Sequence, residues 1–261
     1  MRILILGDVV GKSGRCALKR FIEKDTVKFD ILIVNVENSA GGFGITVKIF
    51  NELKSAGVDF MTSGNHIWDK KEAISVLNEF SDSIIRPANY PPGVAGKGFS
   101  IIEKNGKKIG IINLLGRVFM EPLDDPFRKS MEIIDFFNKN WVNIIIIDFH
   151  AEATAEKQAL GWYLDGKVSA IVGTHTHVQT SDERLLENGT FYISDLGMCG
   201  SVDSVIGTKI EDALYRFNYL VPHTFTVASG NEEIQGILLE INEEDGKVNN
   251  FKRIKEKVLC N

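Results

Sequence analysis

Short apolar runs alternate with longer amphipathic stretches from the N-terminus to residue 185 of the chain. Strands that are buried on both faces of a sheet have continuous apolar sequences, so each run predicts a strand of a covered sheet. The strands predicted in this way span residues 3–6, 31–36, 58–61, 109–114, 144–147 and 168–172.

The stretches between these runs have the spacing of amphipathic helices, and the C-terminal part has a different pattern. Helices are predicted at 11–24, 45–56, 68–79, 127–139 and 152–161, with Thr46, Asp69 and Thr154 as candidate capping residues. After residue 185 the pattern becomes strand and turn, at 189–193, 223–228, 234–241 and 247–254. Asp245-Gly246 is a hairpin signal between the last two strands. The order predicts an α/β fold in which two sheets pack together with helices outside, within a single domain spanning 1–261.

The composition is that of an ordinary globular protein, with 44% hydrophobic residues, 25% charged residues and a net charge of -5 over 261 residues. These values exclude disordered and fibrous classes, and the mild acidity argues against binding of duplex nucleic acid. A small anionic substrate stays open, because a bound metal can supply positive charge. No run approaches the ~18 apolar residues of a transmembrane helix, so no membrane association is expected. Cys16, Cys199 and Cys260 predict no disulfide framework and no CxxC metal site, which fits a reducing cytoplasm.

Polar side chains follow five of the predicted strands, at the point where each strand ends. They are Asp8, Glu37-Asn38, Asn65-His66, His150 and His175-Thr176-His177. Ligands of open α/β sheets bind outside the carboxyl ends of the strands. Because four of the chain's five histidines lie in this set, we expect these side chains to form one site.

Most of these residues also have a plain structural interpretation. Asp8 is an equally good N-cap for the helix at 11–24, and Asn38 and Asn65 are common turn residues. A single histidine after a strand is more often structural than a ligand. His175 and His177 are more specific, because residues i and i+2 of an extended segment point to the same side.

The order of these motifs resembles that of the calcineurin-like metallophosphoesterase superfamily. Its G-N-H, H and G-H-x-H blocks are matched in order by Gly64-Asn65-His66, His150 and the segment 173–177. Two blocks differ, because Val10 replaces the histidine of the D-x-H block and Glu37 replaces the bridging aspartate. This variant, with the segments 5–11, 35–42 and 195–198, resembles the YmdB-type bacterial subfamily, similar to enzymes that hydrolyse cyclic nucleotides.

The resemblance implies a four-layer αββα sandwich of two mixed sheets with helices outside, and two metal ions bridged by Glu37. Asp8, Asn38 and His177 would complete one metal site, and Asn65, His150 and His175 the other. Oxygen and imidazole ligands without thiolates suit iron, manganese or zinc, and iron is the expectation from the family.

The function expected from the resemblance is a dinuclear metal-dependent phosphodiesterase that acts on small phosphodiesters, 2′,3′- or 3′,5′-cyclic nucleotides. A metal-bridging hydroxide would attack phosphorus, and His66 would act as general acid for the leaving oxygen or, alternatively, orient Asn65. The other functions considered are a phosphomonoesterase or protein phosphatase and, in a different class, a metal-binding regulatory protein acting on RNA-processing partners. A homo-oligomer, the physiological substrate and regulatory partners are left open by the sequence.

Four other features give weaker signals. The segment 7–13 resembles a P-loop but has three residues between its glycines where the motif needs four, so we exclude an NTPase. The loop 39–44 is either a lid over the substrate or a turn into the next helix. Arg86 is a candidate phosphate contact, and Tyr90 is a candidate base-stacking residue. His223 lies outside the motifs and is expected to be structural.

Overall fold

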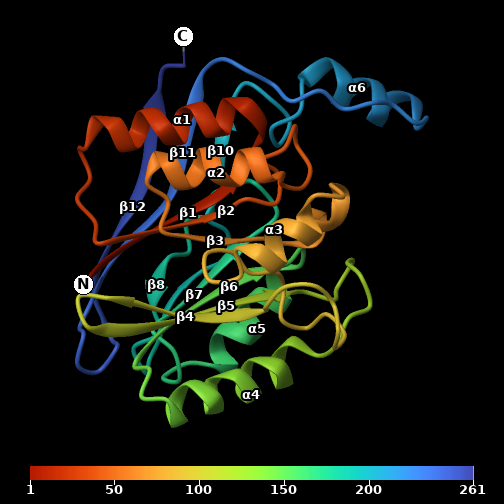
Figure 1. The fold of residues 1–261 in the computed structure, drawn as a ribbon. Coiled ribbons are helices and arrows are strands. Elements are labelled where there is room, and N and C mark those ends of the chain that lie inside the picture. Colours follow the sequence, from red (N-terminus) through yellow and green to blue (C-terminus); the bar gives the residue numbers. More distant parts are fainter. Residues whose placement is uncertain (261) are drawn as a thin grey trace.

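The computed structural model describes residues 1–260, and its centre is a pair of six-stranded sheets packed face to face (Figure 1). The first sheet has the order β12 (Val248–Val258), β11 (Glu232–Ile241), β10 (Met198–Ser201), β1 (Arg2–Val9), β2 (Ile31–Asn35) and β3 (Phe60–Thr62). The second has the order β4 (Phe99–Lys104), β5 (Lys107–Leu115), β6 (Ile144–His150), β7 (Ala170–Thr174), β9 (Phe191–Ile193) and β8 (Arg184–Leu185).

Helices cover the outer face of each sheet and complete four layers (Figure 1). The first sheet is covered by α1 (Gly11–Lys24), α2 (Val47–Ala56) and α3 (Ala73–Glu79). The second is covered by α4 (Pro126–Lys139) and α5 (Thr154–Tyr163). The predicted four-layer α/β architecture of two mixed sheets with helices outside is therefore confirmed. A further helix, α6 (Ile210–Tyr219), stands apart from the layers.

The continuous apolar runs follow from the covering of both sheets on both faces. Ile3 and Ile5 of β1 pack into the apolar layer between the sheets, together with Ile109 and Ile146 of the opposite sheet. Leu4, between them in the sequence, belongs to the layer between the first sheet and its helices. Because side chains alternate across a strand, a strand with apolar neighbours on both faces has no polar positions in its middle.

Parallel pairing brings the functional strand ends to one edge. In the first sheet β1 pairs in parallel with β2 and β10, and β2 pairs in parallel with β3. In the second sheet β5, β6, β7 and β9 form a parallel set. The antiparallel strands β4, β8, β11 and β12 make both sheets mixed. The carboxyl ends of β1, β2, β3, β6 and β7 carry the polar residues that the sequence singled out.

The helix predictions are correct at α1 and at Thr46, whose side chain caps α2 by accepting from the Ile49 N–H at 3.3 Å. The predicted helix 68–79 is wrong as a single element: a 3₁₀ turn, η1 (Asn65–Asp69), precedes α3, and Asp69 caps neither. Thr154 is the first helical residue of α5 rather than its cap. The strand expected at 223–228 is wrong, and α6, β4 and β10 were not expected.

The prediction that the cysteines form no disulfide is wrong for one pair. Cys16 of α1 is bonded to Cys260, 244 residues away in the sequence, with Cα atoms 6.0 Å apart. Cys199 is buried and not in a disulfide. Sequence spacing could not reveal the pair, because only the packing of the C-terminal segment against α1 makes the two residues neighbours. Within residues 1–260, no helix has the length and apolar character needed to cross a membrane.

Candidate metal centre

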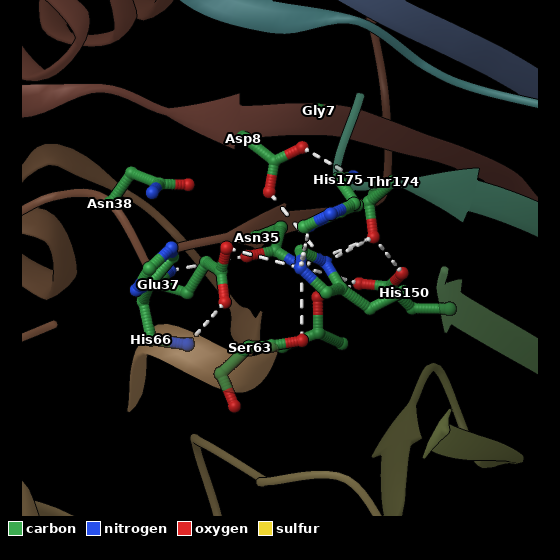
Figure 2. A network of polar contacts seen from close by, with 12 residues as sticks. Gly7, Asp8, Asn35, Glu37, Asn38, Ser63, His66, His150, Thr174 and His175 are labelled. Carbon is green, nitrogen blue, oxygen red and sulfur yellow. Dashed lines mark hydrogen bonds and ion pairs between the residues drawn. The ribbon is translucent and has the colours of Figure 1, made fainter. Parts of the chain in front are cut away.

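The structure brings all the predicted site residues together at the edge where five strands end, and Figure 2 shows six of them, Asp8, Glu37, Asn38, His66, His150 and His175. Figure 2 shows the carboxylates of Asp8 and Glu37 turned toward the imidazoles of His150 and His175. The side chains of Glu37 and His150 approach the backbone so closely at position 64 that only glycine fits there: a Cβ atom on Gly64 would lie 2.4 Å from Glu37 Oε2 and 2.4 Å from His150 Nε2.

One half of the site surrounds His150, which is fully buried. Its Nε2 atom lies 3.1 Å from Glu37 Oε1, 3.1 Å from Asn65 Oδ1 and 3.0 Å from His175 Nδ1. Ligand atoms of Glu37, His150 and His175 all lie within 4.8 Å of one another, a spacing at which they could share a metal ion. This half contains the residues expected for the second metal site.

The other half of the site contains Asp8, Asn38 and His177. His177 Nε2 lies 3.2 Å from Asn38 Oδ1 and 4.0 Å from Asp8 Oδ2. Asp8 Oδ2 accepts from the His175 N–H at 3.1 Å, whereas the buried Oδ1 has no hydrogen-bond partner. The alternative role of Asp8 as a helix cap is excluded, because α1 begins after Val10 without a side-chain cap. A buried carboxylate oxygen without a donor is costly, and a cation at this place would satisfy it, so the residues present fit a metal.

Each of the three imidazoles is held by the ring nitrogen that points away from the centre. His150 Nδ1 contacts the Thr174 hydroxyl at 2.9 Å, and His175 Nε2 lies 3.1 Å from Glu152 Oε2. His177 Nδ1 lies 2.8 Å from the Ile206 carbonyl oxygen. An acceptor at one nitrogen holds a proton there, so the other nitrogen, which faces the centre, is the one that could bind a metal after giving up any proton of its own.

A buried polar network behind the centre was missed by the sequence interpretation. Asp148 of β6 accepts from the hydroxyl of Thr174 at 2.7 Å, from the Thr62 hydroxyl, and from Asn35 Nδ2 at 3.0 Å. Asn35 Oδ1 in turn accepts from the backbone N–H of Glu37 at 3.1 Å. Because Thr174 donates to Asp148, it accepts from His150 Nδ1 and fixes that tautomer. Asn35 and Asp148 are polar residues within otherwise apolar strands, and this contrast is the sequence signal that could have revealed the network.

A buried ion pair, also missed, fixes the loop that carries His175 and His177. Lys157 Nζ donates to Asp195 Oδ2 and to the Thr174 carbonyl oxygen, both at 2.8 Å. Asp195 Oδ2 also accepts from the Thr176 N–H at 3.0 Å. No sequence signal marks this pair, because Lys157 is an ordinary polar residue of the predicted helix 152–161 until packing buries it.

The reason expected for the convergence of His175 and His177 is wrong. The two residues are not in extended backbone: φ is +99° at His175 and +62° at His177. Left-handed backbone is uncommon for residues other than glycine, and such strain is concentrated at functional sites. The histidines therefore meet the site through an irregular turn after β7, held by the Lys157–Asp195 pair.

The electrostatics of the cluster depend on burial and on close opposite charges. Burial raises the pKa of Asp8 to about 6. Burial opposes ionisation of Glu37 and His150 as well, but their mutual attraction outweighs it, so the pKa of Glu37 falls to about 2 and that of His150 rises to about 9. Burial and the neighbouring His150 lower the pKa of His175 to about 3. Perturbed pKa values of this kind, concentrated in a cleft, are typical of functional sites.

His66 sits at the edge of the cluster with its ring half-buried. Its backbone N–H donates to Glu37 Oε2 at 2.9 Å, and its Nδ1 lies 2.9 Å from Asp69 Oδ2. The Phe43 ring packs edge-on against the imidazole, with centroids 4.9 Å apart. The ring of His66 therefore has its own partners and does not orient the Asn65 amide through a hydrogen bond.

A cavity of about 410 Å³ opens in front of the cluster. Five of the predicted site residues contribute to its polar side: Glu37, Asn38, His66, His175 and His177. Its apolar side includes Phe43, Ile206, Phe225 and Val227. The glycine-rich loop 39–44 contributes Gly41, Gly42 and Phe43 to the wall.

Three of the weaker candidates, Arg86, Tyr90 and His223, do not line this cavity. The Arg86 guanidinium is largely buried and donates to backbone carbonyl oxygens, among them that of Pro87 at 2.8 Å, so it is not free to bind phosphate. Tyr90 packs against Trp68 and lines a different groove. His223 lies 2.9 Å from Asp212 Oδ1 of α6, away from the cluster, as its structural interpretation requires.

Comparison with known proteins agrees with this geometry. A family model described as YmdB-like protein matches residues 4–254. The chain belongs to the YmdB-like family. The YmdB-like chain is 47% identical over 256 residues to the 2′,3′-cyclic-nucleotide 2′-phosphodiesterase of Bacillus subtilis, with 97% of this chain and 96% of that protein covered.

Solved structures extend the comparison to the fold of the YmdB-like chain. It superposes on a phosphatase from Mycoplasma pneumoniae with a TM-score of 0.91 and 36% identity, covering 98% of this chain and 93% of that one. A 5′-nucleotidase precursor from Thermus thermophilus gives a TM-score of 0.57 at 14% identity, over 98% of this chain and 54% of that one, which shows a shared fold alone. The resemblance predicted from the motifs is confirmed.

Proposed function

We propose that this protein is a metal-dependent phosphodiesterase that hydrolyses small phosphodiesters, 2′,3′- or 3′,5′-cyclic nucleotides. The 47% identity to a 2′,3′-cyclic-nucleotide 2′-phosphodiesterase, over 97% of the chain, supports the substrate class. The observation that carries the proposal is the orientation of His150, His175 and His177, each held by one ring nitrogen with the other beside a further candidate ligand.

Two metal ions would be held by the residues of the two halves, with Glu37 between them. Asp8, Asn38 and His177 would hold one ion, and Asn65, His150 and His175 the other. Iron is proposed first, with manganese and zinc as alternatives, because the donors are carboxylate, amide and imidazole. Such a pair supplies, when bound, a water of lowered pKa and positive charge beside the phosphate oxygens.

His66 is the proposed general acid. Because Asp69 accepts from Nδ1, the proton that reaches the leaving oxygen is the one on Nε2. The imidazole lines the cavity, where it is accessible to a bound substrate. Protonation of the leaving alkoxide by a positioned side chain contributes roughly 10²–10⁴-fold to rate.

The charges around the cavity favour a small substrate. Among residues 1–260, no lysine or arginine lines this cavity, and Glu152 adds a negative charge at its wall. Long nucleic acids need several cationic side chains for their phosphates. A nucleotide with one phosphate, neutralised at the metal centre, fits this distribution better.

The test is turnover of a set of substrates by the metal-loaded protein. We expect hydrolysis of bis-p-nitrophenyl phosphate and of 2′,3′-cyclic AMP, little hydrolysis of p-nitrophenyl phosphate, and loss of activity with a chelator. His150→Ala should abolish turnover, whereas the matched control His223→Ala should retain it. Preference for the monoester would favour a phosphomonoesterase, and no turnover with iron, manganese or zinc would favour the regulatory alternative; either result would contradict the proposal.

A further inference from the structure

A second hollow, of about 290 Å³, adjoins the candidate metal centre at Asn65 and His175. The rest of its lining is Phe119, Met120 and Glu121, from the segment between β5 and α4. The larger cavity shares only His175 with this hollow. The centre therefore opens into two separate spaces that meet at one of its histidines.

Phe119 is presented to solvent at the second hollow in an unusual conformation. Its side chain is 90% exposed and its φ is +63°. It is the third residue of a turn in which the Met120 N–H approaches the Arg117 carbonyl oxygen at 3.4 Å. Positive φ at such a position favours glycine or asparagine, so a phenylalanine here is an outlier that burial does not explain.

The turn is fixed from beneath by a buried carboxylate. Glu156 of α5 accepts from the Arg117 N–H at 3.0 Å and from the Val118 N–H at 3.2 Å. A Cβ atom on Gly116 would lie 2.7 Å from Glu156 Oε2, so the glycine lets the carboxylate reach the turn. Strained backbone persists when its surroundings determine it, and the strain here holds the ring of Phe119 beside two proposed metal ligands.

Trp141 is a second exposed aromatic residue with left-handed backbone, but it has an ordinary structural explanation and lies far from the candidate site. It is 86% exposed with φ of +59°, but it follows the end of α4, and its N–H bonds to the Asn138 carbonyl oxygen at 3.2 Å. Left-handed residues are common at helix ends. Trp141 also precedes β6, whereas His150 ends that strand, so it lies at the opposite edge of the sheet. Phe119 terminates no helix.

The chemistry of the two hollows favours a ligand with two nucleosides and one phosphate. Among the described residues neither hollow is lined by lysine or arginine, and Glu121 makes the second hollow unfavourable for another phosphate. Nucleobases stack on aromatic side chains regardless of their sequence. A phosphodiester has two ester oxygens: in a cyclic nucleotide both belong to one ribose, whereas in a linear diester each belongs to a different one.

We propose that Phe119 stacks on the second nucleobase of a linear dinucleoside monophosphate, with the single phosphate at the metal centre and one nucleoside in each hollow. This inference rests on the proposed phosphodiesterase function and extends its substrates beyond cyclic nucleotides. In the reaction, the oxygen of water forms a new bond to phosphorus and one P–O bond to ribose breaks. The released ribose oxygen takes a proton, giving one nucleoside and one nucleoside monophosphate.

The experiment compares adenylyl-(3′→5′)-adenosine with 2′,3′-cyclic AMP on the metal-loaded full chain. Phe119→Ala should lower kcat/KM for the dinucleotide by roughly 5- to 150-fold, the effect of losing one base–aromatic stack, and leave cyclic AMP within about twofold. Phe119→Trp should restore dinucleotide turnover, and the matched control Trp141→Ala should leave kcat/KM unchanged for both substrates.

Saturation-transfer NMR with the slowly hydrolysed phosphorothioate dinucleotide gives a readout independent of turnover. Both adenines should receive saturation from the wild-type protein, and one should lose it in Phe119→Ala. Hydrolysis of cyclic AMP without hydrolysis of the dinucleotide would overturn this inference alone, as would equal effects of Phe119→Ala on both substrates or no effect on either. Absence of turnover with both substrates would overturn the phosphodiesterase proposal together with it.

Discussion

Replacing Asp148 by asparagine should reverse the tautomer of His150 with little change in the volume of the core. Asp148 Oδ2 accepts from both Thr62 and Asn35, so in the variant the amide oxygen must take that place. The amide NH₂ group then faces the Thr174 hydroxyl, which has to accept from it and direct its own proton to His150 Nδ1. His150 is left with its proton on Nε2, the nitrogen that faces the metal centre.

The expected loss follows from the cost of disturbing the partner of a ligating imidazole. Such changes lower metal affinity about 10- to 100-fold, which corresponds to about 1.4–2.8 kcal/mol. Asp148 reaches the centre through Thr174, and through Asn35 it also contacts the backbone of the Glu37 loop. Two segments that carry proposed metal ligands are therefore affected, which favours the upper part of this range.

The assay is a competition titration of Mn²⁺ between the protein and a metal-binding fluorophore, with thermal unfolding to verify the fold. Asp165→Asn is the matched control. Asp165 lies in the loop between α5 and β7, at the opposite edge of the sheet, where it accepts hydrogen bonds from Asn188 and Thr190. The control should keep wild-type affinity. An affinity of Asp148→Asn within about twofold of wild type, with the fold intact, would refute the tautomer argument.

Three further predictions concern the general acid, a buried ion pair and the pH dependence of stability. His66→Ala should keep its metal content but lose roughly 10²–10⁴-fold in kcat on 2′,3′-cyclic AMP; unchanged kcat would exclude the acid role. Lys157→Ala leaves the buried Asp195 carboxylate without its cation and should lower the free energy of unfolding by about 3–5 kcal/mol in urea titrations, whereas a loss below about 1 kcal/mol would show that the pair contributes little. For Asp182, burial alone would raise the pKa. Hydrogen bonds from the hydroxyls of Ser194 and Thr180 outweigh burial and hold the pKa below its usual value. The ionised carboxylate therefore stabilises the fold above the unfolded pKa of ~3.9, and this contribution is lost as the pH falls through the folded pKa. Asp182→Asn should consequently unfold at a lower temperature than wild type at pH 7, with the difference shrinking as the pH falls below ~3.9; a pH-independent difference would contradict the assignment.

The layers of the fold and the convergence of the candidate site residues could be predicted because both depend on local signals. Continuous apolar runs such as that of β1 mark strands with neighbours on both faces, and parallel strands bring their ends together. Asp8, Glu37 and His150 were identified by their position after such runs. The motif order then predicted the family that the comparisons confirm.

The parts that sequence reasoning missed depend on contacts between distant segments. Asp148 is 113 residues from Asn35 in the sequence, and Cys260 is 244 residues from Cys16. No spacing rule relates such pairs before the sheets are assembled. Phe119 was missed for a different reason. A single phenylalanine in a loop belongs to no periodic pattern, and only its backbone φ and its exposure in the structure single it out.

Metal content of the purified protein, measured beside His150→Ala, tests the central claim most directly. The wild-type chain should carry about two metal ions when loaded, as expected of a dinuclear phosphoesterase site. His150 Nε2 lies within 3.1 Å of Glu37, Asn65 and His175 ligand atoms, so its removal should release at least the ion of that half. Equal metal content in the two proteins would contradict the metal centre and the phosphodiesterase function proposed from it.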